Sequence, residues 1–510
     1  MVEDSRRFRK DDLTYGAIML LYLGIVVFLT AKHENWRDEA QAWLLARDLN
    51  VIELFRQMSY EGHPCLWHLI LMPFAKLGFP YRTMNVVSML LVASAAGLML
   101  WKSPVSLGWK IPVLFGGAFL YFMPVVSRSY SLIPLFICIN AAIYKKRHQS
   151  PVWYGLSLAL LVQTHIYILP FAGWLSVFWL FEAIDIYRKS RNRRFLIQQG
   201  LGLLLPCFSF LLFLVQMSGV QKSSAFLIHW KDSFSYDTVF NQLNISLFGF
   251  RGLYINRMFP RILYTRPKRS FILILFFLFA PVLVFFLAIK RRQKEVAKAA
   301  GIYLMATLSG LFLMLLLGRT GLQKTAIFAF LPIWLLWTSW RYLQVDKQML
   351  RLTLVNYVGL ALLFLMMNSA AIYDVHNCYS DAADCAAFIR ENLPSDATIF
   401  QNSTAYASSV VAYLNADGLY SLESGESESF AQWINREPRI TDYKSFCESV
   451  ERIRAGTETA YLLIQMKFVE PYIDILTHTD SEDILYSSFL EKDPAPEECY
   501  ILMRISINEE

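Results

Sequence analysis

The chain of 510 residues has little charge, and acidic residues are especially scarce in its first three quarters. Asp, Glu, Lys and Arg make up 17% of the sequence and aliphatic and aromatic residues 55%, and no Asp or Glu occurs between positions 62 and 181. Mean hydropathy is +0.37, and apolar runs of membrane-spanning length recur from Leu13 to Ala371. We therefore expect a polytopic α-helical membrane protein, with membrane lipids around it and no nucleic-acid partner.

Several other signals are missing. The first apolar run, Leu13 to Ala31, follows basic residues 6–10, but no small-residue cleavage site comes after it, so we interpret it as a retained span and not a signal peptide. The seven cysteines have no spacing typical of structural zinc. We find no tandem repeat and no low-complexity linker.

Charge divides the chain into two parts. From Cys378 onward there are 9 Lys and Arg against 24 Asp and Glu, a net of −15, whereas the residues before it carry +22. We predict a transmembrane domain over 1–375 and an acidic α/β domain over 376–510. In the second domain, helices are expected at 382–392, 405–414 and 443–455, and strands at 397–400, 460–465, 484–489 and 500–505.

Basic clusters set the expected orientation. Residues 6–10, 145–147, 188–194, 290–298 and 341–351 should face the cytoplasm, which places the N-terminus inside and the acidic domain outside a plasma membrane, as in a bacterial envelope. The outer loops then cover 32–83 and 218–270. An odd number of crossings is required, so we interpret 63–79 as an outer juxtamembrane segment. The eleven expected crossings are 13–31, 84–101, 111–123, 130–144, 152–168, 170–186, 195–216, 271–289 and three that begin at Gly301, Thr325 and Leu352.

Acidic residues crowd into the first outer loop. Six of the 17 that precede position 376 lie between Glu34 and Glu61, and a membrane protein does not place carboxylates freely. Asn35 is a good N-cap, and Asp38 stands three residues later, so a helix over 36–49 could begin with these two residues as a structural cap alone. The other interpretation gives Asp38 a chemical role.

A second polar group, Glu61-Gly62-His63-Pro64, favours the chemical interpretation. If the loop folds back, Asp38, Glu61 and His63 could deprotonate a hydroxyl or bind a divalent metal ion. The alternative is that Glu61 and His63 are exposed loop residues.

Cations in the outer loops supply the complementary charge. Arg128 precedes Ser129-Tyr130 at a span end, while Arg319 and Lys324 lie in a short outer loop. Such residues either bind an anion such as a lipid phosphate or extend to the membrane interface. A further polar island at 163–167 holds His165 and Tyr167, which either line a cavity or are structural.

Together these motifs resemble the GT-C membrane glycosyltransferases. The resemblance rests on Trp-Arg-Asp-Glu-Ala in the first outer loop, Gly-His-Pro before an apolar helix, and Ser-Arg-Ser-Tyr at an outer span end. The branch most similar includes protein O-mannosyltransferases and lipid A aminoarabinose transferases. The resemblance is good over 35–144, weaker at 164–167 and 319–332, and fades in the acidic domain.

The resemblance implies transfer of a sugar from a polyprenyl-phosphate donor to an acceptor hydroxyl of a glycan, lipid or protein, by an inverting direct displacement. It implies Asp38 as general base or orienting group and Glu39 as its partner. Its remaining implied site residues bind the donor phosphate or line the substrate cavity: Arg128, Arg319, Lys324 and His63 for the phosphate, and Tyr130, His165, Tyr167 and Glu61 for the cavity. A transporter for lipid-linked sugars and a noncatalytic membrane scaffold are the rival interpretations.

Overall fold

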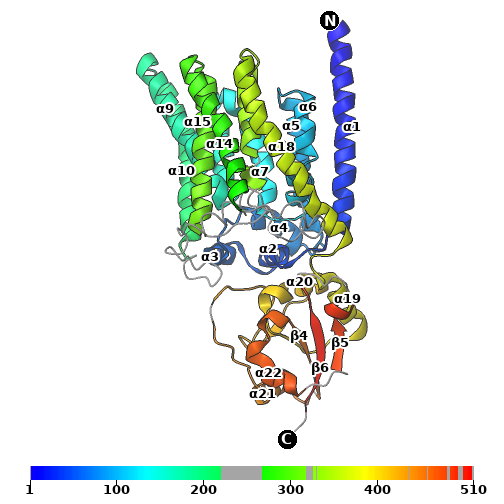
Figure 1. Cartoon of the computed structure of the whole chain (residues 1–510). Coiled ribbons are helices and arrows are strands. Elements are labelled where there is room, and N and C mark those ends of the chain that lie inside the picture. Colours follow the sequence, from blue (N-terminus) through cyan, green and yellow to red (C-terminus); the bar gives the residue numbers. More distant parts are fainter. Residues whose placement is uncertain are drawn as a thin grey trace.

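The computed structural model describes residues 2–219, 267–317, 326–328, 330–434, 436–456, 458–478, 483–491 and 498–507. Figure 1 shows a bundle of long helices joined at one end to a smaller domain that contains a β-sheet. The N-terminus lies at the end of the bundle that is far from the sheet domain. The structure confirms the expected fold class, a helical membrane protein with a C-terminal α/β domain.

Eight long helices run along the bundle in the part of the chain that the structure describes. They are α1 (Val2–Lys32), α5 (Thr83–Lys102), α9 (Leu169–Ser190), α10 (Arg193–Met217), α14 (Pro267–Lys290), α15 (Lys294–Leu317), α17 (Phe330–Leu343) and α18 (Lys347–His376). Among the described residues, six stretches are long and apolar enough to cross a membrane. Four lie within these helices, at 11–32, 83–102, 193–217 and 294–314, and two begin just before α9 and α17, at 166–190 and 326–343. These coincide with six of the eleven expected crossings, and the full count stays a prediction.

Three short helices lie across the bundle end that faces the sheet domain (Figure 1): α2 (Arg37–Asp48), α3 (Val51–Glu61) and α4 (Leu66–Lys76). With 11 residues at about 1.5 Å each, α4 extends roughly 16 Å, about half the hydrocarbon thickness of a bilayer. The segment that we interpreted as juxtamembrane is therefore too short to cross.

Two of the expected crossings are interrupted. The segment predicted at 111–123 forms α6 (Leu107–Leu114), which contains Pro112, and then a π-helix, η1 (Ala118–Phe122). Between them, a Cβ atom on Gly117 would lie 2.6 Å from the backbone of Met367, so α18 approaches the break closely. The segment predicted at 152–168 ends as α8 (Pro151–Val162), and its last residues form the 3-10 turn η4 (Ile166–Ile168) that leads into α9.

The remaining helical elements of the bundle are η2 (Ser129–Ser131), α7 (Leu132–Ile143) and η3 (Tyr144–Lys146). Helices α8 and α10 pack through glycines, because a Cβ atom on Gly155 would lie only 2.0 Å from the carbonyl oxygen of Gly202. A backbone contact this close admits no side chain at either position.

Ion pairs join several helices at the end of the bundle far from the sheet domain. Glu182 of α9 accepts a hydrogen bond from Arg147 at 2.7 Å and also pairs with Lys298 of α15. Residues from two of the basic clusters that we assigned to one side of the membrane therefore lie together. A single carboxylate offsets part of their charge.

The sheet domain contains six strands in the order β3-β2-β1-β4-β6-β5 among the described residues. The strands are β1 (Ile399–Gln401), β2 (Leu419–Ser421), β3 (Ser427–Glu428), β4 (Thr459–Ile464), β5 (Ile484–Ser487) and β6 (Ile501–Ser506). Strand β1 is parallel to both β2 and β4, and the other pairs are antiparallel.

Helices and short turns complete this domain: α19 (Ala382–Asn392), α20 (Thr404–Leu414), α21 (Tyr443–Ile453), η7 (Met466–Phe468), η8 (Glu470–Tyr472), α22 (Ile473–Thr477) and α23 (Ser488–Glu491). All the helices and strands predicted for the domain are present with shifts of at most two residues at each end. The short strands β2 and β3 were not predicted.

One apolar core runs from the bundle into the sheet domain. It includes buried residues of α2 such as Trp43 and Leu44 together with Val410 and Val411 of α20. Figure 1 shows α19 and α20 at the face of the sheet domain next to the bundle. The two parts are thus held together by buried apolar contact, which is typical of a fixed interface.

Candidate active site at the start of helix α2

The first turn of α2 is organised by Glu39. The N-cap is Trp36, and Glu39, three residues later, accepts the Trp36 backbone N–H at 3.1 Å. The predicted cap of Asn35 with Asp38 is wrong, because the Asn35 amide instead donates to the side-chain oxygen of Asn85 at 2.9 Å. Asp38 is consequently not used by the helix cap.

Glu39 also closes a buried chain of charged groups. One of its oxygens accepts the Ser127 backbone N–H at 2.7 Å, and the other lies 3.0 Å from His33. The second nitrogen of His33 lies 2.7 Å from Asp374 of α18. Burial lowers the pKa of His33, but the two carboxylates outweigh it and raise the pKa to about 10. Glu39 is fully buried and fixes the loop, as expected of a positioning residue.

Asp38 faces Arg128 across the mouth of the site. Their side chains form an ion pair at 2.7 Å, and both remain partly accessible, at 27% and 21%. The Arg128 guanidinium lies 5.3 Å from the ring centre of Tyr130 and 5.9 Å from that of Trp36. These rings hold the cation in place through their negative faces. The sequence predicted both charges as site residues, and the structure brings them together.

The sheet domain contributes to the same corner of the molecule, that is, to the group of side chains around Asp38 at the first turn of α2. Glu498 accepts the Arg37 backbone N–H at 3.2 Å, at the positive end of the α2 dipole, and lies 3.5 Å from the Arg37 guanidinium. Burial raises the pKa of Glu498 to about 8, although Arg37 favours its charged form. The Arg37 guanidinium also sits 4.1 Å from the ring centre of Tyr406, on α20.

Glu61 ends α3 and belongs to the same charged group. Its carboxylate accepts from Gln41 at 2.8 Å and Gln57 at 3.2 Å, and its charge interacts with that of Arg128. Burial raises the pKa of Glu61 to about 7, against these hydrogen bonds. The alternative interpretation, in which Glu61 is an exposed loop residue, is therefore wrong, since Glu61 is buried and its pKa lies near neutral pH.

His63 is stacked on His68, with ring centres 5.3 Å apart and planes at 13°. Burial and the nearby Arg128 charge lower the pKa of His63 to about 4, so its imidazole is neutral at pH 7. Among the residues that the structure describes, its buried Nδ1 atom has no hydrogen-bond partner, and neither do the two buried ring nitrogens of His68. A neutral His63 can donate one hydrogen bond to a phosphate but adds no charge.

Three of the four predicted cavity residues, Tyr130, His165 and Tyr167, form a buried aromatic column. The rings of Tyr130 and His165 are 4.6 Å apart, and those of His165 and Tyr167 are 5.1 Å apart. The column begins under Arg128 and continues to the start of α9. Nearby, Gln216 accepts the Cys65 N–H at 2.8 Å and donates to Gln163 at 3.0 Å, which ties this end of the bundle to α4.

No three His, Cys, Asp or Glu side chains in the described ranges lie close enough to hold a metal ion. The predicted ligand set of Asp38, Glu61 and His63 is therefore not assembled, and metal binding stays a prediction. Arg319 and Lys324, predicted to bind phosphate, lie outside the described residues, as does most of the predicted outer loop 218–270.

Comparison with known proteins identifies the fold. The chain is similar to the apo crystal structure of ArnT from Cupriavidus metallidurans at a TM-score of 0.55, with 12% identity over 96% of this chain and 97% of that one. The chain has the GT-C fold. ArnT bound to undecaprenyl phosphate matches over the same shares with 12% identity and a TM-score of 0.47. No family model matches the sequence, and a search of curated proteins finds no match.

The GT-C resemblance expected from the sequence is thus confirmed at the level of the fold. Within this GT-C fold, the partly accessible charges Asp38 and Arg128 lie where the bundle meets the sheet domain. Sequence analysis missed Glu498, Tyr406 and His33, the residues that fix the corner around them. His33 alone carried a local signal, as a histidine next to Glu34 just after the first span.

Proposed function

We propose that this protein transfers a sugar from a polyprenyl-phosphate donor to an acceptor hydroxyl by direct displacement with inversion. The observation that carries the proposal is the Asp38–Arg128 pair, a base and a phosphate-binding cation held 2.7 Å apart on a GT-C fold. ArnT, whose apo structure has this fold, has also been crystallised with undecaprenyl phosphate.

Asp38 is the residue best placed to act on the acceptor. Glu39 is fully buried and its oxygens are engaged by His33, Trp36 and Ser127, so it is not accessible to a substrate. Asp38 would accept the proton of the acceptor hydroxyl as the oxygen forms a bond to the anomeric carbon. The bond from that carbon to the phosphate oxygen breaks, and the polyprenyl phosphate leaves as an anion.

Arg128 would stabilise that anion. A guanidinium binds a phosphate through two parallel hydrogen bonds, and its charge is worth more in a site shielded from water. Engagement with the phosphate would draw Arg128 away from Asp38 and leave the carboxylate available as a base. His63, being neutral, would contribute a single hydrogen bond. Arg319 and Lys324 remain proposed phosphate ligands, and a divalent metal ion a proposed cofactor.

The proposed placement follows from charge. Arg147 and Lys298 meet at the bundle end far from the sheet domain, which we assign to the cytoplasm by the positive-inside rule. The N-terminus is then cytoplasmic, and the candidate active site and sheet domain are extracytoplasmic, at a plasma membrane. The donor's lipid tail would stay in the bilayer while its sugar reaches Asp38.

A transporter for lipid-linked sugars would share the fold and the phosphate contacts. Transporters place their charged sites near the middle of the membrane. Here the charges of the candidate site gather at one bundle end, around α2. This distribution favours transfer at a surface over passage through the bundle.

The deciding experiment uses the full chain in detergent with a panel of undecaprenyl-phosphate sugars and measures released undecaprenyl phosphate and glycosylated product. We expect Asp38→Asn to lose at least about a hundredfold in rate, within the range for removal of a general base. The control is Asp48→Asn, because Asp48 lies on the same helix and its side chain is equally accessible, at 27%.

We expect Asp48→Asn to transfer within about twofold of wild type, since it is remote from the reacting atoms, and thermal unfolding would show that both variants fold. Full activity in a folded Asp38→Asn variant would refute the assignment of the base. Movement of the lipid-linked sugar across vesicles without any transfer would support the transporter instead.

A further inference from the structure

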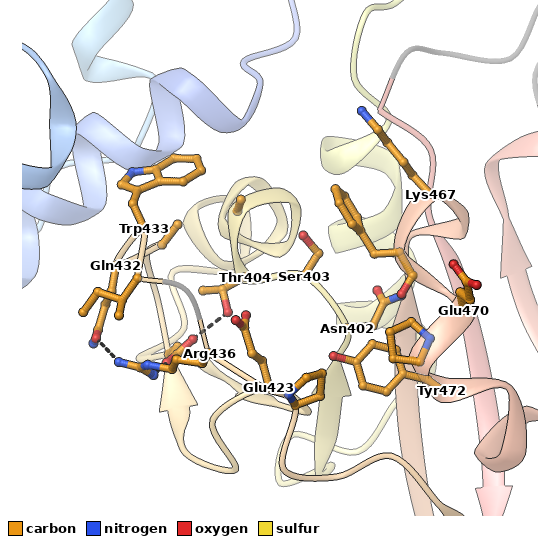
Figure 2. Close-up of a pocket in the computed structure, with 17 residues that line it drawn as sticks. Asn402, Ser403, Thr404, Glu423, Gln432, Trp433, Arg436, Lys467, Glu470 and Tyr472 are labelled. Carbon is orange, nitrogen blue, oxygen red and sulfur yellow. Dashed lines mark hydrogen bonds and ion pairs between the residues drawn. The ribbon is translucent and has the colours of Figure 1, made fainter. Parts of the chain in front are cut away.

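A cavity of about 490 Å³ lies in the sheet domain (Figure 2). Its lining includes residues that lie within four positions after the ends of parallel strands: Asn402, Ser403 and Thr404 after β1, Glu423 after β2, and Lys467 and Phe468 after β4. Ligands of open α/β sheets bind in the crevice outside the carboxyl ends of such strands. The position of the cavity therefore fits a binding site.

The order of the strands also supports a binding site at this cavity. From β1 the chain passes through α20 to β2 on one side, whereas β4, further along the chain, pairs with the other side of β1. The direction of the connections changes at β1, and the crevice opens at such a switch point. The volume also falls within the range of about 300–1,000 Å³ that holds small ligands.

The lining combines aromatic rings with hydroxyl, amide and carboxylate groups. Phe468 is 38% exposed despite its apolar ring, and Trp433 and Tyr472 add two further aromatic walls. Figure 2 shows the Tyr472 hydroxyl directed into the cavity, with Glu423 on the opposite side. Aromatic faces that pack on C–H groups, next to side chains that accept and donate hydrogen bonds, suit a polyhydroxylated ligand.

Charge argues against a phosphate or nucleotide in this cavity. Arg436 is already paired with Glu428 at 3.1 Å, and Glu428 also accepts from Thr404 at 2.6 Å. Lys467 points away from the other labelled side chains in Figure 2. The chain from Cys378 onward carries a net charge of −15, which would repel an anion.

The cavity wall is fastened to the candidate active site. Trp433 has a positive φ of 54°, which is strained for a bulky residue, and its side chain lies close enough to Glu61 to lower the pKa of that carboxyl group. Two residues earlier, the Ala431 backbone exchanges hydrogen bonds of 2.7 and 2.9 Å with Gln41, one helical turn after Asp38. On the other wall, α20 begins at Thr404 and carries the Tyr406 ring that contacts Arg37.

We infer that this cavity binds a carbohydrate portion of the acceptor and presents it to the first turn of α2. The inference rests on the proposed function and makes it more specific, because it selects a glycan from among glycan, lipid and protein acceptors. The bound sugar would stack on Phe468 and hydrogen-bond Glu423.

The test measures binding by the full chain in nanodiscs, without donor, by saturation-transfer NMR. The probes are maltotriose, mannotriose and chitotriose, with inorganic phosphate and glucose 1-phosphate as anionic comparisons. Phe468→Ala and Glu423→Gln alter the cavity. The matched controls are Phe489→Ala, at another exposed phenylalanine of the domain, and Glu448→Gln, at an exposed carboxylate of α21.

We expect at least one trisaccharide to bind, with each cavity variant weakening it at least about tenfold and each control keeping it within about twofold. Absence of trisaccharide binding, equal losses in cavity and control variants, or selective binding of an anionic probe would overturn the inference. A trisaccharide that binds is then offered as acceptor. Transfer to another acceptor without trisaccharide binding defeats only the cavity inference, whereas cavity-dependent binding without any transfer defeats only the proposed function.

Discussion

Replacement of Glu39 by Gln should remove a large part of the stability that the His33 chain provides and change how stability depends on pH. Glu39→Gln keeps the size of the side chain and its ability to accept the Trp36 N–H, but removes the charge 3.0 Å from His33. Histidine titrates near 6.5 when unfolded, and in the folded protein the pKa of His33 is raised to about 10. The protonated imidazole therefore stabilises the fold.

The size of this effect follows from linkage. The contribution of the protonated His33 imidazole to the free energy of unfolding is complete below about pH 6.5 and is lost as pH rises through about 10. At 1.36 kcal/mol per pKa unit, this contribution amounts to at most about 5 kcal/mol. Asp374 supplies part of that stabilisation, at 2.7 Å. We expect Glu39→Gln to cost roughly 3 kcal/mol at pH 7, which lies within the range for breaking a buried ion pair.

The assay is thermal unfolding of the purified full chain in detergent between pH 6 and 10.5. Glu53→Gln is the matched control, because Glu53 occupies the same third position of α3 and caps it in the same way but is exposed. The control should follow wild type, since Gln also serves in a capping box. Equal unfolding temperatures for Glu39→Gln and Glu53→Gln across the pH range would refute the reasoning.

Two further predictions concern the interface and the bundle. Burial raises the pKa of Glu498 to about 8 and disfavours its charge, so the wild-type protein should lose stability as pH rises from about 4.5 to about 8. Glu498→Gln should not show this loss, and unfolding curves recorded across that pH range would detect the difference. Gly155→Leu should destabilise the bundle by several kcal/mol, about as much as a severe core clash or more, because the leucine side chain would meet the backbone of Gly202. The control in the same thermal assay is Gly173→Leu, at a helical glycine with open space around it. A Gly155→Leu variant as stable as Gly173→Leu would contradict the close helix contact.

Much of the architecture was predictable because local patterns determine it. The acidic domain's α19 was placed at its observed bounds, since the apolar residues of 382–392 recur with helical spacing. The break at Gly117 was missed because an apolar run hides a π-turn and a backbone approach from a distant helix. The cap at Asn35 was predicted from propensity, and its hydrogen bond with Asn85, 50 residues away, overrode it.

The candidate site was predictable only in part. Asp38 and Arg128 could each be predicted as site residues because charged side chains in the outer loops of a membrane protein are seldom placed without a function, but their ion pair was not predicted. Glu498 could not, because it is one of 24 acidic residues after position 377 and its partner lies 461 residues earlier. The metal shared by Asp38, Glu61 and His63 stays a prediction: these side chains do not form a group of three ligands among the described residues, and Glu61 is hydrogen-bonded to Gln41 and Gln57.

The contact between Glu498 and the first turn of α2 also orders events during biosynthesis. A chain is made from its N-terminus, so Arg37 and Asp38 emerge long before the carboxylate that caps their helix. The corner around Asp38 can be completed only after the sheet domain has been synthesised and has folded against the bundle. A nascent chain that has not yet reached Glu498 would therefore hold an unfinished site, and the proposed sugar transfer would have to wait until the sheet domain is in place.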